Sequence, residues 1–300
     1  MKPADMIRLI ALSAIWGASF LFLRIIAPVL GALPTAFFRV LFGSVGLVVI
    51  LLVYRLRWDF KGKLGMAMVL GMINSGIPFM MYSLAARVLP AGYSAILNAT
   101  TPLMGVLIGT VFFSDRLTTN KVIGVILGLA GVAVLTQAGP VAMSTPVLLG
   151  AGACLIATAC YGLAGFLTKR WISDQGGLDS KLVALGSQLG AVALLLPFFA
   201  WDVSTQAPIN WGGLGLWSAM AGLGFVCTAF AYILYFKLIA DIGPVKSLTV
   251  TFLIPPFGVL WGALFLGEQL SLAHAFGGAL IGMAVWCVVR PAPVPAPVRA

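Results

Sequence analysis

Several stretches of the chain carry polar and aromatic side chains at helical spacing within otherwise apolar sequence. Residues three or four positions apart share one face of a helix, so each set predicts a polar stripe. The stripes are Asn74, Pro78 and Tyr82; Ser94, Asn98 and Thr101; Thr228, Tyr232 and Tyr235; and Ser247 and Thr251. Hydroxyl and amide groups in an apolar environment need hydrogen-bond partners. Together the stripes therefore predict one central, moderately polar cavity.

Aromatic residues in two other apolar runs are expected to complete the walls of this cavity. They are Trp16 and Phe20 near the start of the chain and Tyr161 near its middle. Such a site can stack a planar or apolar group while hydroxyls and amides orient its polar end, and the rings can also hold a cation. In the alternative interpretation, Ser and Thr bond their own helices and the tyrosines lie at a membrane interface.

Charged residues are rare within the apolar runs. Arg24 and Arg39 lie near ends of their runs, and Arg39 either snorkels to an interface, bonds helix-end carbonyls, or serves as a gate that attracts anions. Asp115 and Glu268 close two runs, where a structural role is expected. Pro102 and Pro255 open the same two runs and are candidate hinges.

The remaining reactive side chains do not form a recognisable catalytic or metal site. The chain has one histidine, His274, and no converging set of acids, and the four cysteines show no metal-ligand spacing. We therefore expect no cofactor and no metal, and an intramembrane enzyme is the disfavoured alternative from another functional class. Since no Asp or Glu lies midway along an apolar run, a facilitative mechanism is favoured over proton coupling through a carboxylate.

The composition shows what must position these residues. Of 300 residues, 61% are hydrophobic and 9% are charged, against about 45–50% and about 25% in soluble domains. With a mean hydropathy of +1.08, the chain is predicted to be an all-α integral membrane protein. Its net charge of +10 is scattered between apolar runs, so its partners are the lipid bilayer and a small-molecule substrate, not nucleic acid.

Charged or turn-rich segments divide the chain into ten apolar runs near the length of about 20 residues that crosses a bilayer. The predicted spans are approximately 7–27, 33–54, 64–84, 91–113, 120–138, 147–168, 181–200, 212–236, 244–266 and 273–289. The proline-rich tail, 291–300, is expected to be a disordered cytoplasmic segment.

Basic residues indicate the orientation of these spans. Most of the 18 Lys and Arg residues fall on one side if the chain crosses ten times. Those on that side are Lys2, Arg8, Arg55, Arg57, Lys61, Lys63, Arg116, Lys121, Lys169, Arg170, Lys181, Lys237, Lys246, Arg290 and Arg299. By the positive-inside rule, both termini are predicted to be cytoplasmic.

The two halves of the chain resemble each other at an offset of 153 residues. This offset superimposes Gly71 on Gly224, Tyr82 on Tyr235, Ser94 on Ser247, Pro102 on Pro255 and Asp115 on Glu268. Each repeat contains five spans. Because five is odd, the second repeat enters the membrane from the opposite side to the first, so residues 1–140 and 141–290 are expected to form inverted repeats. Inverted repeats are typical of transporters that work by alternating access.

The chain also resembles a known family in three motifs. They are Trp16-Gly17-Ala18-Ser19-Phe20, Pro102-Leu103-Met104-Gly105 leading to Asp115-Arg116-Leu117, and Pro255-Pro256-Phe257-Gly258 leading to Gly267-Glu268-Gln269-Leu270. In these it resembles the EamA-type ten-helix exporters of the drug/metabolite transporter superfamily, most closely the YddG-like aromatic amino-acid exporters of bacterial inner membranes.

The resemblance implies export of aromatic or neutral amino acids across the inner membrane. The alternative substrates are organic cations or drugs exported with a proton gradient. A monomer suffices for such a cavity, and the sequence leaves the oligomeric state open.

Overall fold

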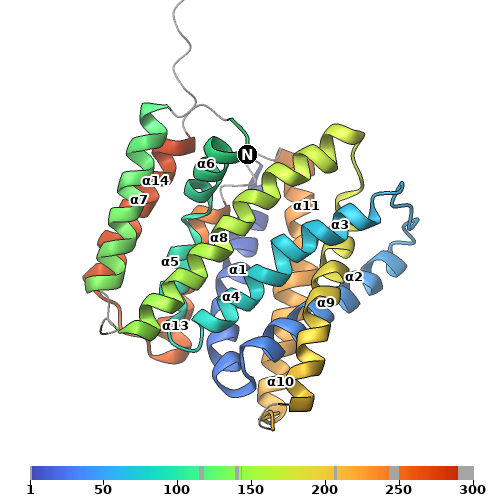
Figure 1. Ribbon diagram of the computed structural model, residues 1–300, viewed down its shortest axis with the longest axis horizontal. Coiled ribbons are helices and arrows are strands. Elements are labelled where there is room, and N and C mark those ends of the chain that lie inside the picture. Colours follow the sequence, from blue (N-terminus) through green and yellow to red (C-terminus); the bar gives the residue numbers. More distant parts are fainter. Residues whose placement is uncertain are drawn as a thin grey trace, which may run out of the picture.

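Every regular element in the computed structural model is a helix, over the residues that the structure describes: 2–114, 118–138, 142, 144–205, 208–242 and 250–289 (Figure 1). The expected tail at 291–300 lies outside these residues. The elements are α1 (Pro3–Leu30), α2 (Ala32–Val53), α3 (Leu64–Gly71), η1 (Met72–Gly76), α4 (Ile77–Ala85), α5 (Ala91–Asn98), α6 (Thr101–Phe112), α7 (Thr119–Ala138), α8 (Thr145–Trp171), η2 (Ser173–Gln175), α9 (Ser180–Thr205), α10 (Leu214–Ala221), η3 (Gly222–Phe230), α11 (Ala231–Ile242), α13 (Val250–Leu266) and α14 (Leu272–Val289).

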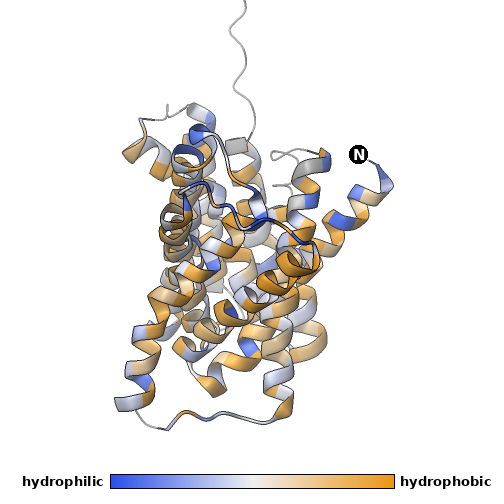
Figure 2. Cartoon of the chain, turned by 90° about the vertical axis from the view of Figure 1, so that its right-hand side faces the viewer, coloured by the Kyte–Doolittle hydropathy of each residue, from blue (hydrophilic) through white to orange (hydrophobic). Residues whose placement is uncertain are grey.

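Many of these helices, alone or joined end to end, form stretches that are long and apolar enough to cross a membrane. Within the described ranges, seven helical stretches meet that requirement, and three shorter apolar helices accompany them, at Thr119–Leu135, Val250–Leu266 and Leu272–Cys287. Hydrophobic residues dominate the length of the helices, and many of the hydrophilic ones gather near the helix ends (Figure 2). The chain is therefore an all-helical, multi-pass membrane protein.

The helices occupy the segments that the sequence predicts, but one of these segments is interrupted. The run predicted as a single span at 91–113 is one membrane-length stretch, Ala91–Phe112, which a turn at Ala99 and Thr100 divides into two helices, α5 and α6. The Thr100 hydroxyl bonds back to the Leu97 carbonyl at 2.8 Å, and Pro102 in the first turn of α6 lacks an N–H. Both features favour a break over a continuous helix. The expected start of the ninth span, 244–249, lies outside the described residues.

Two membrane-length stretches contain π-helical segments that the sequence analysis did not predict. In η1 the backbone N–H of Ile77 bonds to the carbonyl of Met72, five residues earlier, and Pro78 follows at once in α4. Proline supplies no N–H for an α-helical bond, so a wider turn before it accommodates the backbone. In η3 the N–H of Ala231 likewise reaches the carbonyl of Val226. Residues 72–76, moved by the 153-residue offset, fall inside η3.

Helices from the two halves of the chain pack together in related pairs. The contacts pair α1 with α13 and α8 with α6, and they pair α3 with α9 and η3 with α2. Helices α7 and α14 pack along each other at one side of the bundle (Figure 1). The approach of α3 to α9 is close because Gly71 and Gly190 have no side chains. A Cβ on either glycine would overlap backbone atoms of Ser187 or Met68.

Glu268, for which the sequence predicts a structural role at a span end, contacts the N-terminus of α5. Its carboxylate accepts the backbone N–H groups of Ala91, at 2.6 Å, and Gly92, at 3.2 Å. These are unsatisfied donors at the N-terminus of α5, where the N-cap residue is Pro90 and offers no side-chain acceptor. Its counterpart Asp115 lies outside the described residues.

Replacing Glu268 with alanine is expected to destabilise the fold by about 1–3 kcal/mol, because two buried N–H groups lose a charged acceptor. Glu268→Gln keeps one acceptor oxygen and is expected to lie between Glu268→Ala and the wild type. Thermal unfolding in detergent measures the effect, with Asp174→Ala in an exposed turn as the control. An unfolding midpoint for Glu268→Ala equal to that of the wild type would contradict this role.

Candidate functional site

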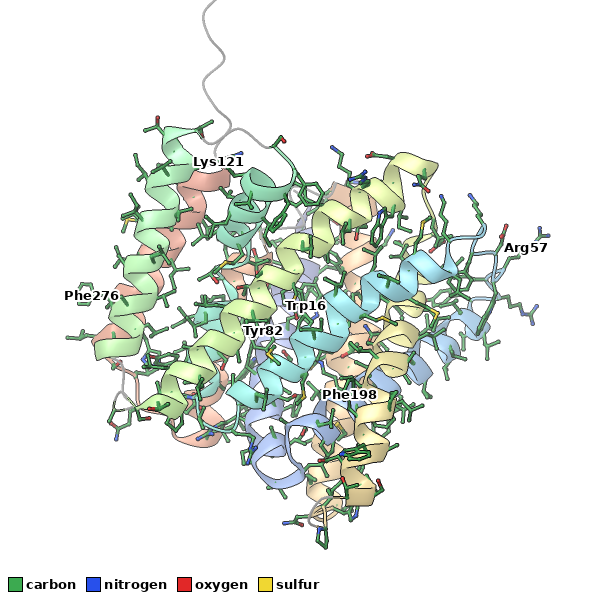
Figure 3. The ribbon with its side chains drawn as sticks, in the orientation of Figure 1. Trp16, Arg57, Tyr82, Lys121, Phe198 and Phe276 are labelled. Atoms are coloured by element: carbon green, nitrogen blue, oxygen red, sulfur yellow. The ribbon has the colours of Figure 1, made fainter. Side chains whose placement is uncertain are left out.

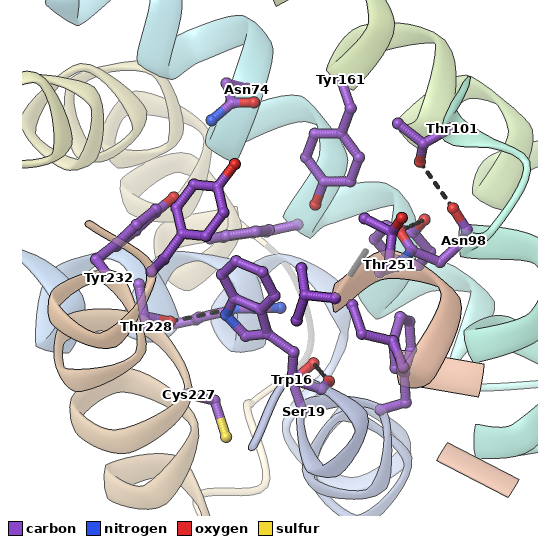
Figure 4. Close-up of a pocket in the computed structure, with 17 residues that line it drawn as sticks. Trp16, Ser19, Asn74, Asn98, Thr101, Tyr161, Cys227, Thr228, Tyr232 and Thr251 are labelled. Carbon is purple, nitrogen blue, oxygen red and sulfur yellow. Dashed lines mark hydrogen bonds between the residues drawn. The ribbon is translucent and has the colours of Figure 1, made fainter. Parts of the chain in front are cut away.

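A cavity of about 310 Å³ lies at the centre of the bundle, and its walls come from both halves of the chain (Figure 4). Trp16 and Tyr82 lie inside the bundle, whereas Arg57 and Phe276 project outward (Figure 3). Every residue predicted to bind substrate in the described ranges lines the cavity, except Pro78 and Ser94. The predicted residues that line it are Trp16, Phe20, Asn74, Tyr82, Asn98, Thr101, Tyr161, Thr228, Tyr232, Tyr235 and Thr251.

Aromatic rings in two packed groups form part of the cavity wall. The ring of Tyr82 meets the edge of Phe20 with centroids 5.3 Å apart and stacks with Tyr161 at 6.3 Å. Trp16 packs against Tyr235 at 5.3 Å. Rings packed on one another are held in fixed orientations, so these five side chains present flat, apolar surfaces to a bound molecule.

Polar side chains line the cavity together with these rings. The Tyr82 hydroxyl donates to Oδ1 of Asn98 at 2.8 Å, which leaves the amide nitrogen of Asn98 without a hydrogen bond to any described residue. The side chain of Asn74 likewise makes no hydrogen bond within the described part of the chain. Two amide groups are therefore available to a ligand in the cavity.

The two π-helical segments supply residues on different sides of the site. Asn74 comes from η1, and Cys227 and Thr228 come from η3. In Figure 4, Thr228 and Tyr232 lie on the opposite side of Trp16 from Asn98 and Thr101. A π segment rotates the side chains that follow it relative to a regular helix and is frequent at functional sites.

Arg39 differs from its expected position at a membrane interface. It is only 6% exposed and lines the cavity. Its guanidinium carbon lies 3.6 Å from the centre of the Phe79 ring, and its Nε donates to the Thr228 hydroxyl at 3.5 Å. The snorkelling interpretation is therefore wrong, because one face of α2 packs against α9 and η3 and turns this side chain toward the cavity.

Two predicted site residues do not reach the cavity. Pro78 is buried in the first turn of α4, and Ser94 is 2% exposed within α5. Each shares its spacing with residues that do line the cavity, but a stripe covers a wide arc of the helix surface, and only part of that arc faces the site. Ser247 lies outside the described residues.

The other residues predicted to gate or to stabilise are distributed around the site. The Arg24 guanidinium donates to the carbonyl of Ala86, at the end of α4, at 2.9 Å. Pro102 begins α6, and Pro255 lies inside α13, where it lines a second, apolar cavity. None of the three lines the central cavity.

Several residues that line the cavity were not predicted from the sequence: Ser19, Phe79, Cys227, Val250 and Ile254. Three of them could have been found from the 153-residue offset between the two halves, because each is the counterpart of a predicted site residue. It pairs Phe79 with Tyr232, Asn74 with Cys227, and Thr101 with Ile254, and both members of each pair line the cavity.

Comparison with known proteins agrees with this architecture. The sequence signature of the EamA-like transporter family matches residues 6–137 and, a second time, residues 148–290. The uncharacterized transporter YvbV of Bacillus subtilis (strain 168) is 30% identical over 84% of this chain and 80% of its own. The uncharacterized inner membrane transporter YedA of Escherichia coli (strain K12) is 26% identical over 94% of this chain and 88% of its own.

One similar protein has a name that states what it transports. The probable terminal-alkyne amino-acid exporter of Streptantibioticus cattleyicolor is 27% identical over 64% of this chain and 61% of its own. The signature matches and the similarity to YvbV each cover most of the sequence. This chain is a member of the EamA-like transporter family.

Proposed function

We propose that this protein is a secondary transporter that exports small metabolites, most specifically aromatic or neutral amino acids, across the bacterial inner membrane. The observation that carries the proposal is the central cavity, whose rings and amides come from both halves of the chain. Its volume of about 310 Å³ lies at the small end of the range of about 300–1,000 Å³ for ligand sites. This size favours a metabolite over a bulky drug.

The proposed transport cycle is alternating access between two inverted repeats, residues 1–140 and 141–290. The family signature that matches twice and the related pairs of helix contacts support this division. In the proposed topology, the seven long and three shorter apolar helices make ten spans, and the distribution of basic residues places both termini in the cytoplasm.

Polar contacts that a rocking motion could break lie along α1. Near its start, Arg8 pairs with Asp241 of α11 at 2.6 Å, and near its end Arg24 bonds to the end of α4. An exposed ion pair such as Arg8–Asp241 stabilises a conformation by about 0–1 kcal/mol, and the bond of Arg24 is a single hydrogen bond to a backbone carbonyl. They are therefore weak enough to open and close during transport.

The substrate assignment rests on three further considerations. The aromatic walls suit a ring or an apolar side chain, the sequence motifs resemble those of the YddG-like aromatic amino-acid exporters, and a relative is a probable amino-acid exporter. The described lining residues include no carboxylate or imidazole. We therefore propose a facilitative mode, and the proton-coupled export of organic cations is the alternative that the experiment must exclude.

Uptake of radiolabelled tryptophan, phenylalanine, threonine and tetraphenylphosphonium into proteoliposomes tests this function. We expect saturable amino-acid entry that is indifferent to an imposed pH gradient, and no entry into protein-free liposomes. Tetraphenylphosphonium movement that follows the gradient, with no amino-acid entry, would contradict the proposal and support proton-coupled cation export.

A further inference from the structure

The central cavity contains a buried positive charge, the guanidinium of Arg39. Arg39 is 6% exposed, and it lies among the rings and hydroxyls of the cavity wall. The ion pairs among the described residues do not include it, and no described Asp or Glu lines the cavity. An ionised side chain away from water is costly without a counter-charge.

The contacts of Arg39 hold the guanidinium in place but leave part of it unused. Phe79 covers one face of the group, and Thr228 accepts the hydrogen bond from Nε. The two terminal nitrogens make no hydrogen bond to any residue that the structure describes. They carry the parallel N–H groups that bind a planar carboxylate in a bidentate manner.

We propose that Arg39 binds the carboxylate of the transported molecule. The side-chain amide oxygens of Asn74 and Asn98 are acceptors for the ammonium group of an amino acid, and the aromatic walls hold its side chain. This assignment rests on the proposed transport function and makes it more specific: the site selects molecules that combine an anionic carboxylate with an apolar or aromatic body. Amines without a carboxylate lack the group that neutralises Arg39.

A series of phenylalanine analogues tests the proposal on the wild-type protein. The competitors of labelled phenylalanine uptake are 3-phenylpropionate, which lacks the amine, and phenylalaninamide and phenethylamine, which lack the carboxylate. Hydrogen bonds to charged groups correspond to about 10- to 100-fold in affinity. We therefore expect 3-phenylpropionate to compete about 10- to 100-fold better than either amine. Equal competition by the amines would overturn the proposal.

Variants of Arg39 connect the selectivity to this side chain. In Arg39→Gln we expect the preference for 3-phenylpropionate over phenylalaninamide to disappear. Arg39→Lys keeps the charge but loses the bidentate fork, so it is expected to retain part of the preference. Arg57→Gln, at an exposed loop far from the cavity (Figure 3), is the matched control. A preference that persists unchanged in a monodisperse Arg39→Gln protein would contradict the assignment.

A binding measurement separates this inference from the transport function. We expect 3-phenylpropionate, but not phenylalaninamide, to raise the unfolding temperature of the detergent-solubilised wild type, and to have no such effect on Arg39→Gln. This result would support the carboxylate site even if phenylalanine were not transported. Stabilisation by chloride that requires Arg39, with no effect of 3-phenylpropionate in a HEPES buffer free of chloride and of other carboxylates, would instead identify an inorganic anion as the ligand and overturn the proposal.

Discussion

Replacing Gly71 with alanine is expected to destabilise the protein by about 3 kcal/mol and to lower its unfolding midpoint in detergent by about 10 °C. The Cβ of alanine would overlap the carbonyl and Cα of Ser187 in α9. Backbone atoms cannot rotate away as a side chain can, so α3 and α9 would have to separate. The same shift would displace η1 and Asn74, and we expect transport to fall with stability.

Gly65→Ala is the matched control for this prediction. Gly65 lies in the same helix, is exposed, and has no neighbouring atom near the position of a new Cβ. Alanine is the better helix former by about 1 kcal/mol, so Gly65→Ala is expected to be neutral or slightly stabilising. Equal unfolding temperatures for the two alanine variants would show that the close helix approach at Gly71 does not limit stability.

The second large effect is expected at Tyr82. This residue contacts Phe20 and Tyr161 through its ring and Asn98 through its hydroxyl, so its removal opens the cavity wall and releases three neighbours. We expect Tyr82→Ala to reduce the initial rate of transport by at least about tenfold at equal membrane abundance. This loss corresponds to about 1.4 kcal/mol in the binding of the cargo or of the transition state.

A milder change separates the two contributions of Tyr82. Tyr82→Phe keeps the ring contacts and loses one hydrogen bond of about 1 kcal/mol, so a reduction of about fivefold is expected. Tyr54→Ala removes an exposed tyrosine at the end of α2, 62% of which is accessible, and is expected to transport normally. Wild-type rates in both Tyr82 variants would place Tyr82 in a purely structural role.

The break between α5 and α6 illustrates what hydropathy alone does not determine. Residues 91–113 are apolar throughout, and apolarity predicts membrane burial but not helix continuity. The turn at Ala99 and Thr100 depends on local hydrogen bonds and on a proline two residues later, and these compete with the helical ones. Pro255, the counterpart of Pro102, lies inside a continuous α13. The same residue type therefore has different consequences in its two surroundings.

Arg39 shows what sequence spacing does not determine about the candidate site. Its place near the end of an apolar run is compatible with an interface, and sequence spacing does not show which face of α2 is turned inward. The packing of α2 against η3 decides this, because it brings Thr228 to the guanidinium. The same limit explains why Pro78 and Ser94 were wrongly expected in the cavity wall. They have the spacing of the lining residues, but they do not face the cavity.

The sequence by itself determined that this protein is a helical, multi-pass membrane protein, where its helices lie, and which polar and aromatic residues belong to the same helix faces. These features follow from local composition and periodicity, which act within one helix at a time. Only the tertiary structure decided which faces meet around the central cavity, where the helices widen or break, and that a buried arginine faces the cavity. Those features depend on close contacts between helices far apart in the chain, such as Gly71 against Ser187, and no single segment contains that information.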